Sequence, residues 1–193
     1  MIKNIVFDVG GILFDDSLAN TSLVLGEDAT EIYHKAYGTT FRDCLLGDMM
    51  VAEHVESFKR DADYPKLKYL LSKENLHISY PLLKENLDYI VSLKDRYSLY
   101  LLTNITADSY EYIINTIDID SIFSGGVYSF REHIVKPDKR IYNLLLDRYH
   151  LLKEETIFFD DRRKNVDAAI ECGIAAAVFN NIEDIKNNLE KDI

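Results

Sequence analysis

The chain of 193 residues is poor in cysteine and proline, and it has fewer basic than acidic side chains. Its two cysteines, Cys44 and Cys172, are too few for the disulfide framework of a small secreted domain. Only three prolines occur, and no Pro/Gly-rich stretch, internal repeat or low-complexity tract divides the chain. No apolar run approaches the roughly 18 residues that a membrane span needs. We therefore expect a soluble, folded protein with reduced thiols.

The charge and the first residues narrow the expected partners and location. With 22 Lys and Arg against 33 Asp and Glu, the formal net charge is −11. Binding to nucleic acid or to an anionic membrane needs clustered basic side chains, so we expect neither as a partner. The chain begins with MIKNIVFDVGG, which leads into a strand-like segment without a signal-peptide pattern, and we expect a cytoplasmic protein. The sequence leaves the oligomeric state open.

Hydrophobic residues make up 47% of the chain, which is enough for a buried core. Short β-branched or apolar runs have the length of strands that are buried on both faces. They lie at residues 4–9, 98–103, 126–129, 156–160 and 174–179. Between the later runs, apolar residues follow a helical spacing, as Tyr110, Ile113 and Ile117 do. Strands that alternate with helices predict an α/β fold with a Rossmann-like parallel sheet.

The segment of residues 17–95 interrupts this alternation. It carries helical stripes of apolar residues, such as Val51, Val55 and Phe58, and no convincing strand. We therefore predict a core formed by residues 1–16 and 96–193, with residues 17–95 inserted after the first strand as a helical cap. In open α/β sheets, ligands bind outside the carboxyl ends of the strands, and an insertion at this point would lie above them.

Polar and charged side chains occur where the carboxyl ends of these strands are expected. They are Asp8, Thr103, Asn104, Lys136, Asp160 and Asp161. Such ends meet at one edge of a parallel sheet, so the three carboxylates would repel one another and raise each other's pKa. A hard divalent cation relieves that repulsion, and Mg²⁺ binds one or two carboxylates, a backbone carbonyl and water. The sequence therefore predicts a Mg²⁺ site.

The same strand ends carry groups that suit a phosphate. Thr103, the Asn104 amide and Lys136 can bind the phosphate oxygens that the cation leaves free. A carboxylate that faces the phosphorus can act as a nucleophile and form an aspartyl-phosphate. The two glycines after Asp8 let the backbone turn sharply and bring N–H groups close to the phosphate. Together these groups predict phosphoryl-transfer chemistry.

Four sequence motifs occur in order: FDVGGILFD, LLTN, IVKPDKRIY and IFFDDRRKNVDAAIECG. They resemble the four motifs of the haloacid dehalogenase-like (HAD) hydrolase superfamily. The resemblance spans nearly the whole chain and is closest to subfamily IA, whose members have a small helical cap after the first strand. That subgroup includes glucose-1-phosphatases, other sugar-phosphate phosphatases and the N-terminal phosphatase domain of soluble epoxide hydrolase. The cap segment FRDCLLGDM resembles its loop between cap helices.

The resemblance implies a Mg²⁺-dependent phosphatase of a small phosphorylated metabolite, such as a hexose-1-phosphate, with an aspartyl-phosphate intermediate. The family's residue roles carry over to the positions that match its motifs. They are the nucleophile and metal ligand Asp8, the backbone carbonyl of Gly10 on the metal, Thr103 and Asn104 on the phosphoryl oxygens, Lys136 between nucleophile and phosphate, the metal ligand Asp161, and Asp160 and Asn165 as ligands directly or through water. Fixed charges would then stabilise the in-line displacement.

One position departs from the pattern of these phosphatases. They carry an Asp two residues after the nucleophile as general acid and base, and this chain has Gly10 there. General acid–base catalysis contributes roughly 10²–10⁴-fold, so we expect a preference for phosphates with good leaving groups. Some cap-bearing relatives that resemble glucose-1-phosphatases also carry Gly at this position. Asp15, Asp16 and the cap residues are the alternatives for the missing acid.

Two other functions are compatible with parts of this pattern. Haloacid dehalogenases share the nucleophile and also lack the plus-two Asp, but they are metal-independent and do not require the Asp160–Asp161 pair. A non-catalytic binding or regulatory protein would keep the fold after losing the general acid, although the nucleophile, Thr103 and Lys136 are all present. The single residues also have structural alternatives, such as a helix cap for Asn104.

Overall fold

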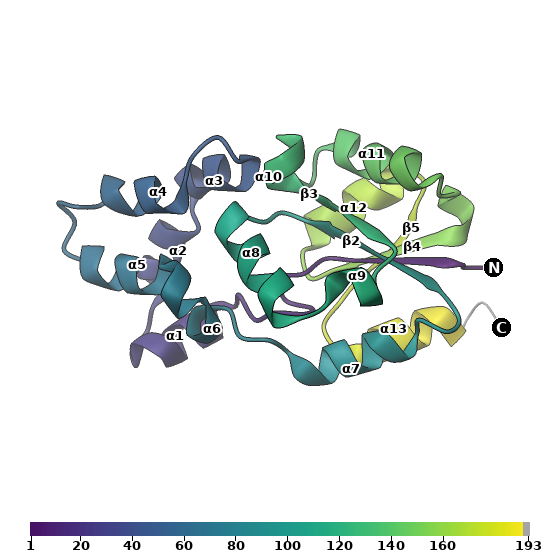
Figure 1. Cartoon of the computed structure of the whole chain (residues 1–193), viewed down its shortest axis with the longest axis horizontal. Helices are drawn as coiled ribbons and strands as arrows, with labels where there is room; N and C mark the ends of the chain where they lie inside the picture. The colour runs from purple at the N-terminus through teal and green to yellow at the C-terminus, as the bar shows by residue number, and fades with distance from the viewer. Residues whose placement is uncertain (191–193) are drawn as a thin grey trace.

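A computed structural model describes residues 1–190 and shows an α/β core with a group of short helices at one end (Figure 1). The described residues contain five parallel strands in one sheet, in the order β3-β2-β1-β4-β5. The strands are β1 (Asn4–Phe7), β2 (Ser98–Thr103), β3 (Gly125–Tyr128), β4 (Thr156–Asp160) and β5 (Ala175–Val178). The predicted fold class, a Rossmann-like parallel sheet with helices, is confirmed.

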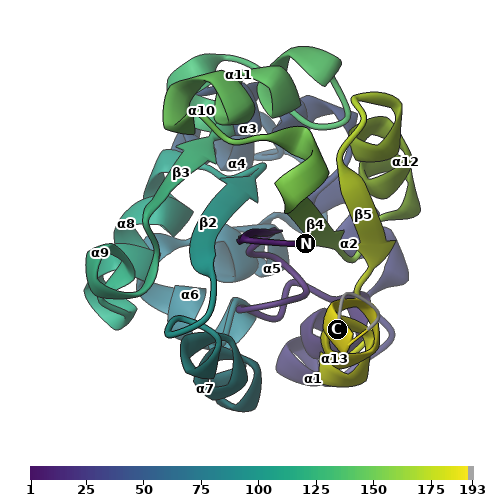
Figure 2. The same cartoon turned by 90° about the vertical axis from the view of Figure 1, so that its right-hand side faces the viewer.

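Side chains of the central strand alternate between two hydrophobic clusters, one on each face of the sheet. Ile5 and Phe7 pack with the helices on one face, and Val6 packs with the helices on the other. The first face is covered by α8 (Ala107–Thr116), α9 (Ile119–Ile122) and α13 (Ile182–Leu189), and the second by α11 (Lys139–Tyr149) and α12 (Arg163–Glu171). Figure 2 shows α11 and α12 on the opposite side of the sheet from α13. This two-sided burial explains why the strands read as continuous apolar runs.

The segment between β1 and β2 forms short helices with a hydrophobic cluster of their own. They are α1 (Leu18–Leu25), α2 (Thr30–Ala36), α3 (Arg42–Leu46), α4 (Val51–Ser57), α5 (Tyr64–Leu71) and α6 (Leu76–Ser79), with the 3-10 turns η1 (Thr39–Phe41) and η2 (Lys73–Asn75). Ile32, Phe41 and Leu67 belong to this separate cluster. In Figure 1, α2 to α5 lie beyond the carboxyl ends of the strands, at the far end from the N-terminus.

Helix α7 (Lys84–Ser92) differs from the other helices of the expected insertion. Its residues Leu87 and Ile90 pack in the same cluster as Ile5 and Phe7 of β1. In both views α7 lies beside α13 (Figures 1 and 2). The expected boundary at residue 95 therefore groups α7 with the wrong neighbours, because an apolar stripe shows that a helix buries one face but not against which element. The remaining limits of core and cap stay a prediction.

The two chain segments that join core and insertion run side by side. The Asp15 N–H donates to the Pro81 carbonyl at 2.9 Å, and the Leu83 N–H donates to the Leu13 carbonyl at 2.8 Å. Phe14 forms isolated bridges with Gly10 and with residue 82. These contacts fold the residues after β1 back toward its carboxyl end, which places the start of the insertion next to Asp8.

One further boundary differs from the sequence-based expectation. The first strand ends at Phe7, because the chain turns at once through residues 8–11. Helix α11 begins at Lys139, with Asp138 as its N-cap, so Pro137 lies before the helix. The short helix α10 (Ser129–Glu132) and the turn η3 (Lys153–Glu155) complete the elements. None of the helices in residues 1–190 is long and apolar enough to cross a membrane.

Candidate active site

Three carboxylates lie together at the carboxyl end of the sheet. Asp8 follows β1, and Asp160 and Asp161 lie at the end of the neighbouring strand β4. Each offers one oxygen, and these oxygens lie within 4.8 Å of one another. Asp8 and Asp160 are buried, and the side chain of Asp161 is 31% exposed. The parallel register of β1 and β4 thus brings together two motifs that are about 150 residues apart in the sequence.

Lys136 offsets part of this negative charge. Its Nζ lies 2.9 Å from Asp8 Oδ2 and 2.6 Å from Asp160 Oδ2, and it donates to the Leu102 carbonyl at 2.8 Å. The side chain is fully buried. Burial disfavours the charged ammonium, but the carboxylates of Asp160 and Asp8 outweigh burial and raise the pKa of Lys136. The lysine therefore stays positively charged between the two acids.

Asn104 fixes the backbone that carries Lys136. The Asn104 Nδ2 donates to the Lys136 carbonyl at 3.0 Å, and the Asn104 Oδ1 accepts from the Lys136 N–H at 2.8 Å. This pair of bonds ties the segment after β2 to the loop before α11. The structure thus shows a positioning function of Asn104 that the sequence did not indicate.

Asp160 is surrounded by hydrogen-bond donors. Its Oδ2 accepts from Lys136 and from Asn165 Nδ2 at 3.0 Å, while its Oδ1 accepts from the same amide at 2.9 Å and from the Arg162 N–H at 2.8 Å. A carboxylate has about four lone-pair sites, and these contacts use them. Burial raises the pKa of Asp160, but Lys136 and the other donors lower it on balance. Asp160 therefore holds Lys136 in place, and its four acceptor positions are all used by protein donors.

Asn165, in the first turn of α12, has one atom that the protein does not satisfy. Its Oδ1 is buried and has no hydrogen-bond partner among the described residues. An unpaired buried acceptor costs about 1–3 kcal/mol, so a ligand at this oxygen would remove a real penalty. Asp8 and Asp161 offer clustered carboxylate oxygens, and Asn165 lines the same cavity as Asp8; carboxylate and amide oxygens are the ligands that a hard cation such as Mg²⁺ prefers.

The pKa values of Asp8 and Asp161 reflect this crowding of acids. Burial raises the pKa of Asp8 to about 7, with Asp160 and Asp161 adding to the effect and Lys136 opposing it. Burial, together with the nearby Asp16, raises the pKa of Asp161 to about 6. In the protein alone these two acids therefore hold protons close to neutral pH, and a divalent cation bound between them would favour their ionised forms.

The two glycines after Asp8 make room for two carboxylates. A Cβ atom at Gly10 would lie 2.6 Å from Asp16 Oδ2, and one at Gly11 would lie 2.9 Å from Asp161 Cγ. Gly11 also has a φ of +70°, a backbone angle that residues other than glycine rarely adopt. Any side chain in this turn would displace an acid of the site.

Asp16 and Asp161 are linked by one arginine. Arg162 Nη2 lies 3.6 Å from Asp16 Oδ2, and its Nε lies 3.9 Å from Asp161 Oδ1. Burial and the charge of Asp8 raise the pKa of Asp16 to about 6, although Arg162 opposes this effect. Arg162 thus balances part of the negative charge of the two acids.

A cavity of about 120 Å³ lies between the acidic edge and the insertion. Its core side includes Asp8, Gly10, Asn104, Asn165 and Arg162. Its other walls come from the insertion and from the start of α8, and the residues are Asp16, Tyr33, Tyr37, Phe41, Leu45, Val51, Leu70, Leu71, Leu76, Tyr80, Ile105, Thr106, Asp108 and Ser109. The nucleophile candidate therefore faces a cavity with one charged end and one largely apolar end.

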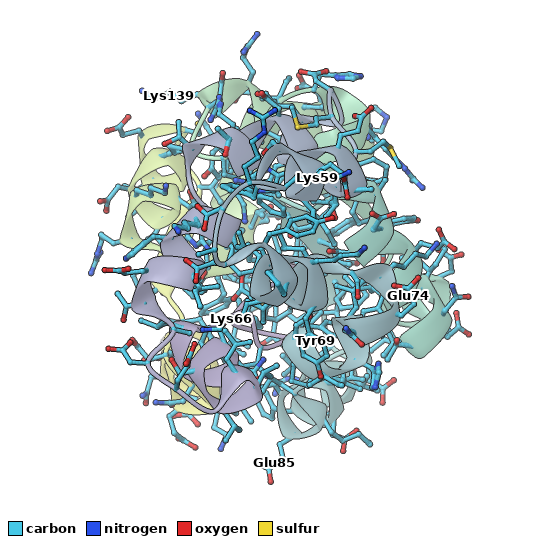
Figure 3. All side chains as sticks on the ribbon, turned by 90° about the vertical axis from the view of Figure 1, so that its left-hand side faces the viewer. Lys59, Lys66, Tyr69, Glu74, Glu85 and Lys139 are labelled. Atoms are coloured by element: carbon cyan, nitrogen blue, oxygen red, sulfur yellow. The ribbon has the colours of Figure 1, made fainter. Side chains whose placement is uncertain are left out.

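The tyrosines of the insertion divide into two groups. Tyr33 and Tyr37 line the cavity. Tyr69 is 41% exposed and lies on the outer face of the insertion, which Figure 3 views directly. Their separation depends on the crossing of α2 and α5, which no local pattern encodes.

Thr103 and Gly10 also lie at this edge of the sheet. Thr103 is buried at the end of β2, next to Asn104, and Gly10 lines the cavity. The structure brings Asp8, Lys136 and Asp161 into one cluster as the motif order indicated. The catalytic and binding roles of these residues stay predictions.

Comparison with known proteins identifies the family to which this α/β core and helical insertion belong. The family model described as "Haloacid dehalogenase-like hydrolase" matches residues 5–179. The protein therefore belongs to the haloacid dehalogenase-like hydrolases, as the four motifs indicated.

Two curated relatives have named activities. One is the "Phosphorylated carbohydrates phosphatase" of Thermotoga maritima, which is 26% identical over 98% of this chain and 91% of the relative. Another is the "D-ribitol-5-phosphate phosphatase" of Bacteroides thetaiotaomicron, which is 27% identical over 90% of this chain and 89% of the relative.

Solved structures share the fold. A HAD-family enzyme of Bacteroides thetaiotaomicron in complex with magnesium and inorganic phosphate has a TM-score of 0.72 at 19% identity, covering 92% of this chain and 94% of that one. A HAD-like family hydrolase from Porphyromonas gingivalis has a TM-score of 0.69 at 26% identity, covering 98% of both chains. A dehalogenase also matches, with a TM-score of 0.70 at 18% identity over 94% of this chain and 86% of that one.

Proposed function

We propose that the protein is a Mg²⁺-dependent phosphatase that hydrolyses a small phosphorylated metabolite through an aspartyl-phosphate on Asp8. The observation that carries this proposal is the position of the Asp8 carboxylate, which lines the cavity while Lys136 and Asp161 adjoin it from the core. A buried carboxylate that is held by a fixed cation and open to a cavity is placed to attack a bound phosphoryl group. The named activities of the two related phosphatases support the same chemistry.

The oxygen donors around Asp8 fit Mg²⁺. Asp8, Asp161, the Gly10 carbonyl and the unpaired Asn165 Oδ1 would hold the ion, and Asp160, whose acceptor sites are used, would act from behind through Lys136 and Asn165. When bound, Mg²⁺ would neutralise charge between the nucleophile and the phosphate. A magnesium and phosphate complex of a structural neighbour is consistent with this assignment.

The other polar residues would bind and orient the phosphoryl group. Lys136 holds Asp8 in place and adds a fixed positive charge. The stabilisation that this charge provides would increase as negative charge develops on the phosphoryl oxygens. Asn104 lines the cavity and also fixes Lys136, so its contribution combines contact with the phosphate and positioning. Thr103 is assigned to a phosphoryl oxygen on the strength of its motif alone.

The named activities of two relatives support a class of substrate. The named relatives act on phosphorylated carbohydrates and on D-ribitol-5-phosphate. We infer a small phosphorylated metabolite as the substrate, and hexose-1-phosphates are the first class to assay.

Phosphate release in the presence and absence of metal tests the proposal. We expect the purified protein to release phosphate from p-nitrophenyl phosphate with Mg²⁺ and to lose that activity in EDTA. Asp8→Asn should lower kcat by roughly 10³-fold or more, because a nucleophile is lost. Asp120→Asn, an exposed acid in α9, is the matched control and should behave as the wild type.

The other two functions make different predictions in the same assay. A dehalogenase would release halide from a 2-haloacid in EDTA and would leave phosphate esters intact. A non-catalytic protein would show the same negligible rate for the wild type and for Asp8→Asn. Either result would overturn the proposed phosphatase.

A further inference from the structure

The turn after Asp8 carries Gly10 at the position where the related phosphatases have an acidic side chain, and another residue occupies the space of that side chain. A Cβ atom at Gly10 would lie 2.6 Å from Asp16 Oδ2 and 3.1 Å from Asp16 Cγ. The carboxylate of Asp16 therefore occupies the space into which a side chain at position 10 would extend. That position is where the phosphatases resembling this chain carry their general acid.

The backbone explains how Asp16 reaches this place. Phe14 forms a bridge with Gly10, and the Gly11 N–H donates to the Phe14 carbonyl at 2.8 Å, so the chain folds back on itself directly after the turn. The Tyr33 hydroxyl donates to the Asp16 carbonyl at 3.1 Å and fixes the residue from the side of the insertion. Arg162 lies 3.6 Å from Asp16 Oδ2 and holds the carboxylate beside Gly10.

Asp15 is excluded from the same role by its own contacts. Its Oδ1 accepts from the Ser17 N–H at 2.9 Å, at the start of α1, and it does not line the cavity. Asp16 lines that cavity together with Asp8 and Gly10. Asp108 also lines it, but from the first turn of α8, whereas the three described atoms nearest to a Cβ at position 10 all belong to Asp16.

We propose that Asp16 is the general acid and base of this enzyme, supplied from the linker in place of the missing carboxylate at position 10. This inference rests on the proposed phosphatase activity. In the first step an Asp8 oxygen forms a bond to phosphorus while the ester P–O bond breaks, and the Asp16 carboxylic acid gives its proton to the leaving oxygen. In the second step the Asp16 carboxylate takes a proton from water, whose oxygen attacks phosphorus as the bond to Asp8 breaks, releasing inorganic phosphate.

The dependence of rate on the leaving group tests this role. We expect Asp16→Asn to lower kcat/KM for an alkyl phosphate, such as glycerol phosphate, by roughly 10²–10⁴-fold. For p-nitrophenyl phosphate, whose leaving group needs no proton, the loss of kcat/KM should be less than about tenfold. Asp15→Asn is the matched control, and it should leave the dependence on the leaving group unchanged.

A relocation of the carboxylate supplies a second readout. Gly10→Asp alone should impair the enzyme, because the new side chain meets Asp16. The kcat/KM for glycerol phosphate of the double variant Gly10→Asp with Asp16→Ser should be at least about tenfold higher than that of Asp16→Ser alone. A purely structural role of Asp16 predicts no recovery. Thermal unfolding of each variant confirms that the comparison is between folded proteins.

The outcomes separate this inference from the function on which it rests. Equal losses of kcat/KM for both esters in Asp16→Asn, or a raised Mg²⁺ requirement with no leaving-group effect, would overturn the acid–base role and leave the phosphatase standing. A wild type that releases no phosphate from either ester with Mg²⁺ would overturn both.

Discussion

Replacing Lys136 by Met tests the charge arrangement on which the site depends. The substitution removes an ammonium that lies 2.9 Å from Asp8 Oδ2 and 2.6 Å from Asp160 Oδ2, in a fully buried position. At an effective dielectric constant of about 20, each contact supplies roughly 6 kcal/mol of gross attraction, most of which the desolvation of the charges offsets. Removing one partner of such a buried pair costs about 3–5 kcal/mol, because the other charge stays behind. For a chain of this length, the midpoint of thermal unfolding would fall by roughly 6–20 °C.

Thermal unfolding of the metal-free protein at pH 7.5, followed by circular dichroism, measures this loss. Lys139→Met is the matched control, since Lys139 lies on the surface (Figure 3) and pairs with Glu171 at 2.8 Å with both side chains more than half exposed. We expect the control to lose less than about 1 kcal/mol. Equal stabilities of the two variants would refute the reasoning. At pH 5.5 the loss from Lys136→Met should shrink, because Asp8 can then take up a proton.

Three other predictions follow from the same geometry. Burial raises the folded-state pKa of Asp8 to about 7 and of Asp161 to about 6, so the native state binds more protons than the unfolded state between about pH 4 and 7. The metal-free protein should therefore lose stability in urea unfolding as the pH rises from 5.5 to 8. Saturating Mg²⁺ should remove that trend. Gly11→Ala should cost about 1–3 kcal/mol and weaken Mg²⁺ binding measured by calorimetry, because φ is +70° and the new methyl group meets Asp161; unchanged Mg²⁺ affinity would contradict this. Asn104→Ala removes two hydrogen bonds to the Lys136 backbone and should lower the free energy of unfolding by about 1–3 kcal/mol. A change below about 0.3 kcal/mol would show that these hydrogen bonds are not needed to stabilise the loop before α11.

The sheet and the acidic cluster were predictable from the sequence because their signals are local. Runs of apolar residues at the lengths of buried strands correctly located all five strands of the described chain to within a few residues. The polar residues that follow those runs had to meet once the strands were parallel, since parallel strands place their carboxyl ends at one edge. The proximity of Asp8 and Asp160 could thus be predicted from the parallel arrangement of the strands alone, without knowledge of any contact.

The features that the sequence missed depend on contacts between distant elements. Helix α7 has the same amphipathic pattern as the helices of the insertion, and only its packing against β1 distinguishes it. The engagement of all acceptor sites on Asp160, and the use of Asn104 to hold Lys136, are properties of three-dimensional hydrogen bonding that residue types do not reveal. The proximity of Asp16 to Gly10 depends on the loop that brings Phe14 beside Gly10 in a parallel bridge, and residue types alone do not reveal that pairing.

The paired linkers have a consequence for the timing of the reaction. Residues 13–15 and 81–83 are hydrogen-bonded to each other where the chain enters and leaves the insertion, and the insertion meets the core again where Ser129 Oγ donates to the Leu45 carbonyl at 2.6 Å. Asp16 lies just beyond the paired segments and is tied through its carbonyl to Tyr33 of the insertion, whereas Asp8 belongs to the core. An outward rotation of the insertion would therefore carry Asp16 away from Asp8 while it admits substrate or releases phosphate. The complete set of reacting groups would exist only while the cavity is shut, which would limit the exposure of an acyl phosphate to bulk water.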